Sequence, residues 1–511
     1  MQKTICIIVT LLLAAGASAA GPSNAKSPLA INLGGISDWA TELAFVDAFK
    51  QSRTWISQEK GKAWGKGPAL DLTPEGWVRS LRPGQRAETI LLGVGTHKPA
   101  GQYVCLYEGK GEIQFKGDVA TIKWSGPGRI ELDVKPRNAI FLSIAETDPS
   151  DPIRNIRLIM PGFEKTYAKQ PFNPAFLKRW AKFRAIRFMD WQRTNGSPIV
   201  TWPGRSTLKR SNQSGRKGVA IEYMIALANT QKADPWFCMP HLADDDFIRR
   251  YAQLVKKTLD PKLKIYVEYS NECWNGQFPQ ARYCGQKGKE LKLSDNAFQA
   301  QLFYYSKRSV EIFKIWAEVF GSTDRLVRVL ASQSANPWVS KQVTGFQDAW
   351  KYADALGVAP YFGHRLGSPK TQDQVAKMTL DEVIAACSDA IDKNQKILAG
   401  QAKVAAGYKL DLIAYEGGQH IVGHGGAENN KALEKLFHTA NRDPRMKKLY
   451  LKDLAGWKQS GGKLFAVFSS TGRYSKWGSW GVLEHADQDP TTAPKYQALL
   501  EFIEKNPIWW K

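Results

Sequence analysis

The segment that most constrains the fold runs from Lys264 to Asn275 and reads KIYVEYSNECWN. Its first half, Lys264–Tyr269, is rich in β-branched and aromatic residues, which favour a β-strand. The dipeptide Asn271-Glu272 follows after Ser270, and Trp274 comes two residues later. An amide beside a carboxylate is an unusual pair of groups at the end of a buried strand. The segment therefore predicts a strand whose C-terminal end carries functional side chains.

Seven further short apolar segments alternate with segments of helical periodicity. The expected strands are Leu29–Asn32, Ala185–Met189, Trp236–Pro240, Lys264–Tyr269, Leu326–Ser332, Ala355–Tyr361, Asp411–Tyr415 and Leu464–Phe468. The expected helices include Pro174–Phe183, Gly218–Thr230, Asp244–Leu259 and Asp295–Phe320. Asn173 is expected to cap the first of these helices. Eight strands that alternate with helices predict an α/β fold, a (β/α)₈ TIM barrel, whose C-terminal strand ends form the catalytic face.

Residues 71–163 differ in character from the rest of the chain. Short β-rich runs recur there, separated by Gly, Pro, Asn and Asp at intervals of about ten residues. This pattern predicts an all-β sandwich module inserted between the first strand and the first helix of the barrel. The barrel itself is expected to comprise residues 21–70 and 164–511. The insert could bind glycan or only buttress the barrel, and tethering at both ends favours the buttress.

The first twenty residues have the pattern of a signal peptide. Lys3 provides the positive start, Ile5–Ala15 the apolar run, and Ala17-Ser18-Ala19 a small-residue cleavage site. The apolar run is too short to span a membrane, and no later segment is long enough. We therefore expect an exported protein, secreted or periplasmic, without a membrane span.

The chain is strongly basic, with 71 Lys and Arg, 48 Asp and Glu and a formal net charge of +23. Such a charge favours anionic partners, namely acidic polysaccharide, an anionic cell envelope or nucleic acid. The basic residues are spread through the chain, however, with no long basic run and no nucleic-acid-binding motif. We therefore expect a solvated basic surface and no nucleic-acid partner.

The cysteines do not form the pattern of a disulfide framework. Removal of the signal peptide with Cys6 leaves an odd number, Cys105, Cys238, Cys273, Cys284 and Cys387. Cys273 and Cys284 are close enough in sequence to clip one loop after the fourth strand. Buried free thiols are the favoured alternative.

A second glutamate occupies the position equivalent to Glu272 at another predicted strand. Asp411–Tyr415 is a short apolar run that ends in Glu416, Gly417 and Gly418. The ends of strands four and seven face each other across a barrel mouth. Retaining glycoside hydrolysis requires two carboxyl groups about 5–5.5 Å apart, one ionised and one protonated.

The two glutamates and their strand positions resemble clan A of the retaining glycoside hydrolases. In that clan the fourth strand ends in Asn-Glu and the seventh in Glu. The resemblance implies that Glu272 is the general acid/base, that Glu416 is the nucleophile, and that Asn271 contacts the sugar 2-hydroxyl. Alternatively, each glutamate only pairs with an arginine at the barrel rim.

Three further positions match the clan. Arg187 corresponds to the arginine that keeps the nucleophile ionised, although a core ion pair with Glu268 is an alternative. His241 corresponds to a histidine that contacts sugar or acid, although it could be purely structural. Tyr361 corresponds to the tyrosine that hydrogen-bonds the nucleophile. Around these, the expected substrate-binding residues are Trp274, Trp477, Trp480 and His420.

The chain also departs from the clan pattern. Ala359 occupies the place of a histidine that often stands two residues before the tyrosine. Strand eight continues into Phe468-Ser469-Ser470 rather than into a platform tryptophan, a role that Trp477 or Trp480 could fill. These differences indicate a divergent branch rather than a close cellulase. The segments NLGGISDW, RFMDWQRTN, YVEYSNECWN and AYEGGQH resemble secreted bacterial proteins labelled as cellulose-binding.

Other chemistries lack their motifs. No nucleophile elbow, Walker loop, zinc-protease motif or dinucleotide fingerprint occurs. Asp244-Asp245-Asp246 could bind a divalent cation, but an acidic first helical turn is the favoured interpretation. His420 and His424, on a glycine-rich loop, are assigned to substrate contact or loop structure rather than to metal. We expect neither a metal nor a cofactor.

The sequence thus predicts a secreted glycoside hydrolase that cleaves a β-linked polysaccharide or oligosaccharide by a retaining, double-displacement mechanism. The alternative is a non-catalytic carbohydrate-binding protein on the same barrel scaffold. A third option, suggested by the basic charge, is a lyase or hydrolase of acidic glycans. The sugar, the linkage and the choice between endo and exo action are left open.

Overall fold

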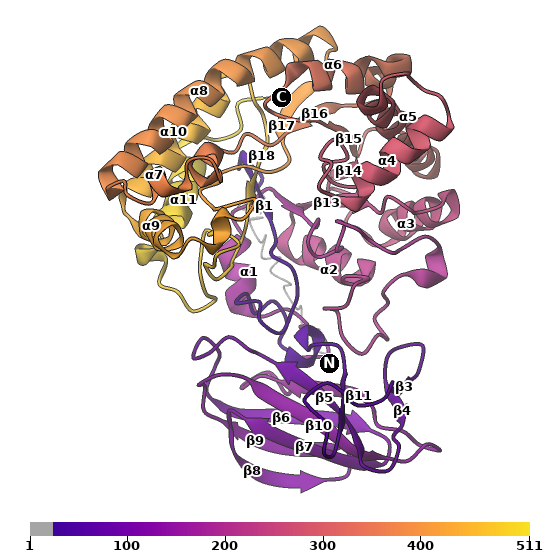
Figure 1. The fold of residues 1–511 in the computed structure, drawn as a ribbon. Coiled ribbons are helices and arrows are strands. Elements are labelled where there is room, and N and C mark those ends of the chain that lie inside the picture. Colours follow the sequence, from indigo (N-terminus) through magenta and orange to yellow (C-terminus); the bar gives the residue numbers. More distant parts are fainter. Residues whose placement is uncertain (1–23, 511) are drawn as a thin grey trace, which may run out of the picture.

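The computed structural model describes residues 24–510, and the expected signal peptide lies outside them. Eight parallel strands close into a barrel in chain order (Figure 1). They are β1 (Leu29–Asn32), β12 (Ala185–Arg187), β13 (Asp234–Met239), β14 (Ile265–Tyr269), β15 (Leu326–Ala331), β16 (Ala355–Val358), β17 (Asp411–Ala414) and β18 (Phe465–Phe468). Each overlaps a predicted strand, so the (β/α)₈ barrel prediction is confirmed.

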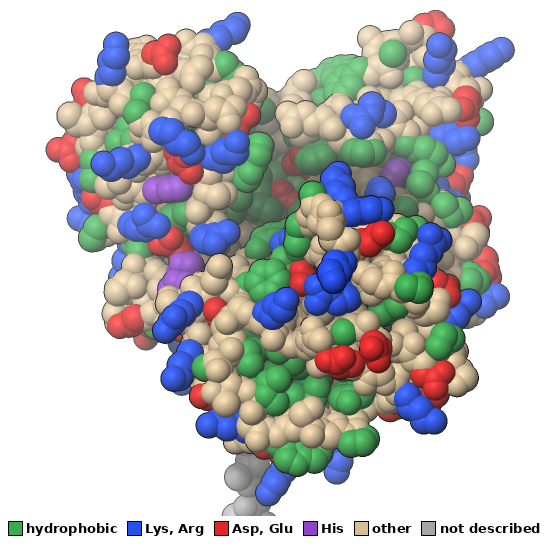
Figure 2. Space-filling view, turned by 60° about the horizontal axis from the view of Figure 1, so that its bottom comes forward, with side chains coloured by type: hydrophobic (Ala, Val, Ile, Leu, Met, Phe, Trp, Pro, Cys, Tyr) green, Lys and Arg blue, Asp and Glu red, His purple; other side chains and the backbone are tan. Residues whose placement is uncertain are grey.

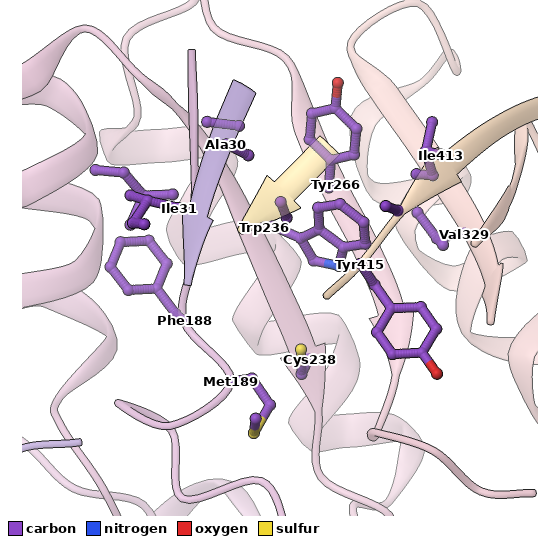
Figure 3. Packing of buried hydrophobic residues seen from close by; sticks show 14 of the residues in the cluster. Ala30, Ile31, Phe188, Met189, Trp236, Cys238, Tyr266, Val329, Ile413 and Tyr415 are labelled. Carbon is purple, nitrogen blue, oxygen red and sulfur yellow. The ribbon is translucent and has the colours of Figure 1, made fainter. Parts of the chain in front are cut away.

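The barrel strands are buried on both faces because their interior is packed with side chains and their exterior is covered by helices. Every residue of β1, β13 and β14 is buried. Trp236 stacks on Tyr266 with ring centroids 5.0 Å apart, and Tyr415 lies beside them (Figure 3). This continuous apolar packing fixes the strand ends from which the polar side chains of the mouth project.

Helices surround the barrel, and several of them begin at a capping residue. They are α1 (Pro174–Trp180), α2 (Ile221–Gln231), α3 (Asp245–Thr258), α4 (Pro279–Glu290), α5 (Ala297–Phe320), α6 (Pro337–Gly345), α7 (Gln372–Val375), α8 (Leu380–Gly407), α9 (Lys431–Arg442), α10 (Arg445–Gln459) and α11 (Pro494–Lys505). Asn173 accepts a hydrogen bond from the amide of Ala175 at the start of α1, as predicted. Asp244 caps α3 in the same way. The acidic triplet is therefore the beginning of a helix.

The inserted module contains two four-stranded antiparallel sheets and a short hairpin. One sheet has the order β2 (Ile56–Glu59), β5 (Gln85–Leu91), β10 (Ile140–Thr147), β7 (Gly111–Gly117), and the other β11 (Arg154–Ile159), β6 (Gly101–Glu108), β9 (Arg129–Val134), β8 (Val119–Gly126). The hairpin is β3 (Asp71–Leu72) with β4 (Val78–Ser80). β2 pairs with β5 yet precedes residue 71, where we expected the module to begin. Its short run, ISQE, is too polar to be recognised as a strand without its partner.

The module lies against loops that follow barrel strands (Figure 1). Arg53, just before β2, forms an ion pair with Asp38 of the loop after β1, at 2.7 Å. The amide of Gln213, in the loop after β12, donates to the carbonyl of Lys50. The ring of His97 stacks on His485, in the loop after β18, with centroids 3.5 Å apart. These contacts favour the interpretation of the module as a buttress for the barrel mouth.

The five cysteines outside the expected signal peptide, Cys105, Cys238, Cys273, Cys284 and Cys387, are all buried free thiols. The structure therefore favours the alternative without a disulfide between Cys273 and Cys284. Within residues 24–510, no helix is both long enough and apolar enough to cross a membrane.

Helices α4 and α5 pack closely and hold the loop that follows β14. The side-chain amide of Gln301, on α5, donates to the carbonyl of Cys273 at 2.7 Å. Gly288 makes the close approach possible, because a Cβ atom there would lie 2.2 Å from the carbonyl oxygen of Ala300. Gly285, in the same helix, would place its Cβ 3.6 Å from its nearest neighbour, an ordinary contact.

We expect Gly288→Ala to lower the free energy of unfolding by about 1–3 kcal/mol, because the helices must move apart. Gly285→Ala is the matched control and should leave stability unchanged or raise it by up to about 1 kcal/mol, since alanine is the better helix former. Urea unfolding followed by circular dichroism measures both. Equal effects of the two substitutions would contradict the close contact at Gly288.

Candidate active site

Arg187, at the end of β12, connects the polar side chains of the barrel mouth and is fully buried. Its Nη1 donates to Oε1 of Glu416 at 2.7 Å and to Oδ1 of Asn32 at 3.0 Å. Its Nε and Nη2 donate to Glu268, and Nη2 also donates to Oδ1 of Asn271 at 2.9 Å. The guanidinium therefore serves both the expected contact with Glu416 and the alternative ion pair with Glu268.

Glu416 follows β17 and projects into the mouth with 7% of its side chain exposed. One carboxylate oxygen accepts from Arg187, and the other accepts from the hydroxyl of Tyr361 at 2.9 Å. A charged donor on one oxygen and a neutral donor on the other both stabilise an anionic carboxylate. A buried anion that is still reachable from the mouth is the form that a nucleophile requires.

Glu272 lies on the loop after β14, where Ser270 and Glu272 both have positive φ, 57° and 43°. This local reversal ends the strand and turns the Glu272 side chain toward β17. Its Oε1 lies 3.1 Å from the hydroxyl of Tyr415, and its Oε2 accepts from Nδ2 of Asn275 at 2.9 Å. No arginine or lysine of the described chain forms an ion pair with it, in contrast to Glu416.

The surroundings of Glu272 raise its pKa to about 7. Burial is the largest cause, and the negative charge of Glu416 is the next. The hydrogen bonds from Asn275 and Tyr415 act in the opposite direction but do not cancel the increase. The two glutamates thus belong to one site, because the charge of Glu416 contributes to the raised pKa of Glu272.

Asn271 is oriented by a chain of amide groups. Its Oδ1 accepts from Arg187, and its Nδ2 donates to Oδ1 of Asn195 at 3.1 Å. Nε2 of Gln280 donates to the same Asn195 oxygen and to the backbone carbonyl of Asn271. The amide therefore stands in a fixed orientation between Arg187 and the loop after β12.

The aromatic residues expected around the site form a connected group. Tyr361 makes edge contacts with Trp480 and His420, with ring centroids 5.8 and 5.5 Å apart. Nε1 of Trp480 donates to the carbonyl of Trp477, whose ring is 66% exposed. Trp274 contacts a different residue: its Nε1 lies 3.3 Å from the hydroxyl of Tyr415, which in turn contacts Glu272.

His241 has different surroundings from the other expected residues. It follows β13, is buried, and makes an edge contact with Tyr283 of α4 at 5.5 Å between ring centroids. Its Nδ1 has no hydrogen-bond partner within residues 24–510, and burial lowers its pKa to about 4. The ring is therefore neutral and has a free nitrogen.

Three residues that sequence reasoning missed complete the mouth. Tyr415 contacts Glu272, Asn195 positions Asn271, and Asp190 has its pKa raised to about 6 by burial and then by the charge of Glu416. Each follows the end of a barrel strand, as Glu272 and Glu416 do. Their position after a predicted strand was the one sequence signal for these residues. Many residues without a functional role share that position, so it does not identify them.

Histidines cluster beside the aromatic group. Nδ1 of His364 lies 3.3 Å from Nδ1 of His420, and the rings of His364 and His424 stack with centroids 4.4 Å apart. Burial lowers the pKa of His420 to about 3. Within residues 24–510, no group of three or more His, Cys, Asp or Glu side chains has a geometry that could hold a metal ion.

No protein-family model matches the sequence, and no curated protein matches it either. Solved structures with a similar course of the chain include an arabinofuranosidase of glycoside hydrolase family 51 from Xanthomonas axonopodis pv. citri. Its sequence identity is 9%, its TM-score is 0.42, and the match covers 66% of this chain and 68% of that one. A 4-O-α-L-rhamnosyl-β-D-glucuronidase from Fusarium oxysporum 12S has 11% identity, TM-score 0.39, and coverage of 62% and 61%.

A third similar structure is a broad-specificity endoglucanase of the GH5-4 group from Clostridium acetobutylicum. Its identity is 10%, its TM-score 0.37, and the coverage is 65% of this chain and 91% of that one. At this level of likeness, the function has to be argued from the site itself.

We expect Glu416→Gln to lower the pKa of Glu272 from about 7 by about one unit, because a neighbouring negative charge is removed. Titration of the glutamate side chains by carbon-13 NMR measures the change. Tyr361→Phe is the control, since it removes a hydrogen bond from Glu416 but leaves its charge. An unchanged Glu272 pKa in Glu416→Gln would show that the two carboxyl groups do not interact.

Proposed function

We propose that this protein is a retaining O-glycosyl hydrolase that cleaves a β-linked polysaccharide or oligosaccharide. The observation that carries the proposal is the contrast between the two glutamates. Glu416 receives hydrogen bonds from Arg187 and Tyr361 on its two oxygens, whereas the pKa of Glu272 is raised to about 7. Retaining hydrolysis needs two carboxyl groups in one site, an anionic one that attacks the sugar and a protonated one that donates to the leaving oxygen.

In the first step, Glu416 attacks the anomeric carbon while Glu272 donates its proton to the glycosidic oxygen. The C–O bond to the leaving sugar breaks, and a covalent glycosyl–Glu416 ester forms. In the second step, Glu272, now anionic, takes a proton from water as the water oxygen attacks the same carbon. The ester breaks, Glu416 becomes a free carboxylate again, and the sugar is released with its original anomeric configuration.

Neighbouring residues have supporting roles in this scheme. Arg187 and Tyr361 stabilise Glu416 as it leaves the ester in the second step. Tyr415 and Asn275 orient Glu272, and Trp274 is available to pack against the departing sugar. Asn271, held by Arg187 and Asn195, is placed to hydrogen-bond a hydroxyl of the sugar under attack.

We expect Glu416→Ala to abolish product release, and Glu272→Ala to reduce it sharply, on a panel of neutral and acidic polysaccharides. Loss of the acid/base group should reduce kcat by about 10²–10⁴-fold, the range typical of general acid–base catalysis. Glu318→Ala, at an exposed ion pair on α5, is the matched control and should retain full activity. Proton NMR of the first product then reports its anomeric configuration.

Cleavage that survives both substitutions would refute the assignment of the two glutamates. Inversion of configuration would refute the double displacement. Binding of a glycan by the wild-type protein with no cleavage of any substrate would instead support the carbohydrate-binding alternative.

The pH dependence of kcat/KM provides a separate test. Glu272 acts first as an acid and must be protonated, so activity should fall as the pH rises through its pKa of about 7. The dinitrophenolate of a dinitrophenyl glycoside leaves without being protonated. The first step with this substrate should therefore not slow down as the pH rises through the pKa of Glu272. An alkaline limb of equal size with both substrates would contradict the role of Glu272 as the acid.

A further inference from the structure

One end of the inserted module carries a hollow that has no part in the candidate active site. Its volume is about 680 Å³, within the range of about 300–1,000 Å³ that ligand sites occupy. It lies at the start of β5, whereas the end of β5 leads to Gly93, whose amide donates to the carbonyl of Asp38 in the barrel. The seven residues of β5 span about 20 Å. The hollow and this contact with the barrel therefore lie at opposite ends of the strand.

The hollow has a positive lining. Lys60, Arg82 and Arg86 contribute to it, and all three residues are exposed. None of their side chains forms an ion pair or a hydrogen bond within residues 24–510. Glu146 is the one carboxylate of the lining, so three cations face a single anion there. Basic side chains are also prominent on the face of the molecule that carries the module (Figure 2).

An exposed tryptophan stands on the same face of the sheet. Nε1 of Trp64 donates to Oε1 of Glu88 at 2.9 Å, and Nε2 of Gln58 donates to the same oxygen at 3.2 Å. Arg86 and Glu88 are two residues apart on β5, so their side chains project from one face. That face is the outer one, because Ala87 between them is fully buried. The indole is thus fixed through its nitrogen, while 56% of Trp64 remains exposed.

An exposed indole beside unpaired cations matches a polysaccharide whose sugars carry carboxylate groups. The C–H face of a sugar ring packs on an indole. A guanidinium binds a carboxylate through two parallel hydrogen bonds, and Arg82 and Arg86 each present a free one. Both oxygens of Glu88 already accept hydrogen bonds from neighbouring side chains, so this carboxylate is not free to pair with the arginines.

The same features fit a nucleic acid less well. Proteins that bind single strands stack successive bases on several aromatic side chains. Within residues 24–510, Trp64 stands alone as an exposed indole on this face of the sheet. A glycan needs only one such ring if its charged groups are bound beside it.

We propose that this face of the module is a second, non-catalytic binding site that holds a polysaccharide with carboxylate groups. Trp64 packs against a sugar ring, and the cations of the hollow pair with the carboxylates. The net charge of +23 raises the concentration of such an anionic polymer at the protein surface. Binding here involves neither Glu272 nor Glu416, so it is independent of the proposed function. The module then contacts the barrel with one end and the polymer with the other.

The test measures binding of polygalacturonate to the intact Glu272→Gln variant by isothermal titration calorimetry, so that cleavage does not compete with binding. The methyl ester of the same polymer is the neutral counterpart, with the same rings and no charge. We expect polygalacturonate to bind and its methyl ester to bind at least about tenfold more weakly. Trp64→Ala and Arg86→Ala should each weaken binding of polygalacturonate by about tenfold, the effect of losing one good contact.

Trp124→Ala and Lys123→Ala are the matched controls and should bind polygalacturonate as the parent does. Both residues are exposed on β8, which belongs to the other sheet of the module. Trp124 is 48% exposed, close to the value for Trp64, and the side chain of Lys123 is unpaired within residues 24–510, like that of Arg86. Arg86→Ala removes a side chain without a partner, so a loss of binding in this variant does not arise from unfolding.

Equal binding of polygalacturonate and its methyl ester would overturn the proposal, as would unchanged binding in Trp64→Ala and Arg86→Ala or no binding of polygalacturonate. Tighter binding of single-stranded poly(dT), lost in the same two variants, would overturn it in favour of a nucleic acid. Turnover separates this result from the proposed function. If the wild-type protein cleaves a glycan but does not bind polygalacturonate, only the module site fails. If the site variants lose binding but no glycan is cleaved, only the hydrolase fails.

Discussion

The guanidinium of Arg187 is the interaction on which the barrel mouth depends. It is fully buried and donates to Glu268, Glu416, Asn32 and Asn271, which come from or follow three different barrel strands, β14, β17 and β1. A buried cation is tolerated only when it is paired and its donors are satisfied, and removal of one partner from such a group costs about 3–5 kcal/mol. The strand ends are therefore coupled, and the position of each carboxyl group depends on the others.

Arg187 also gives the two candidate catalytic glutamates different electrostatic surroundings. Glu416 receives one arm of the guanidinium and the Tyr361 hydroxyl, whereas Glu272 has only the neutral partners Tyr415 and Asn275. Burial then acts on Glu272 without a compensating positive charge at hydrogen-bond distance, and its pKa rises to about 7. Two residues of the same type thus have different electrostatic surroundings because only one of them contacts the arginine.

The inserted module contacts the loops that surround the barrel mouth. Its contacts are with loops that follow β1, β12 and β18, and these loops also line a common cavity of about 610 Å³. The Arg53 guanidinium both pairs with Asp38 and lies over the ring of Trp39. An insertion placed between the first strand and the first helix therefore contacts three of the loops around the barrel mouth, and such contacts restrict loop motion.

The sequence by itself determined the barrel, because its eight strands and several of its helices are marked by local periodicity and by caps such as Asn173. It also determined that Glu272 and Glu416 follow strands four and seven. Only the tertiary structure decided that the cysteines stay as free thiols, that Ile56–Glu59 joins a sheet, and that Asp190 lies close enough to Glu416 for their charges to interact. The physical reason is the separation of the partners along the chain. Closure of the barrel brings together side chains that lie tens to hundreds of residues apart, and no local pattern records which of them will meet.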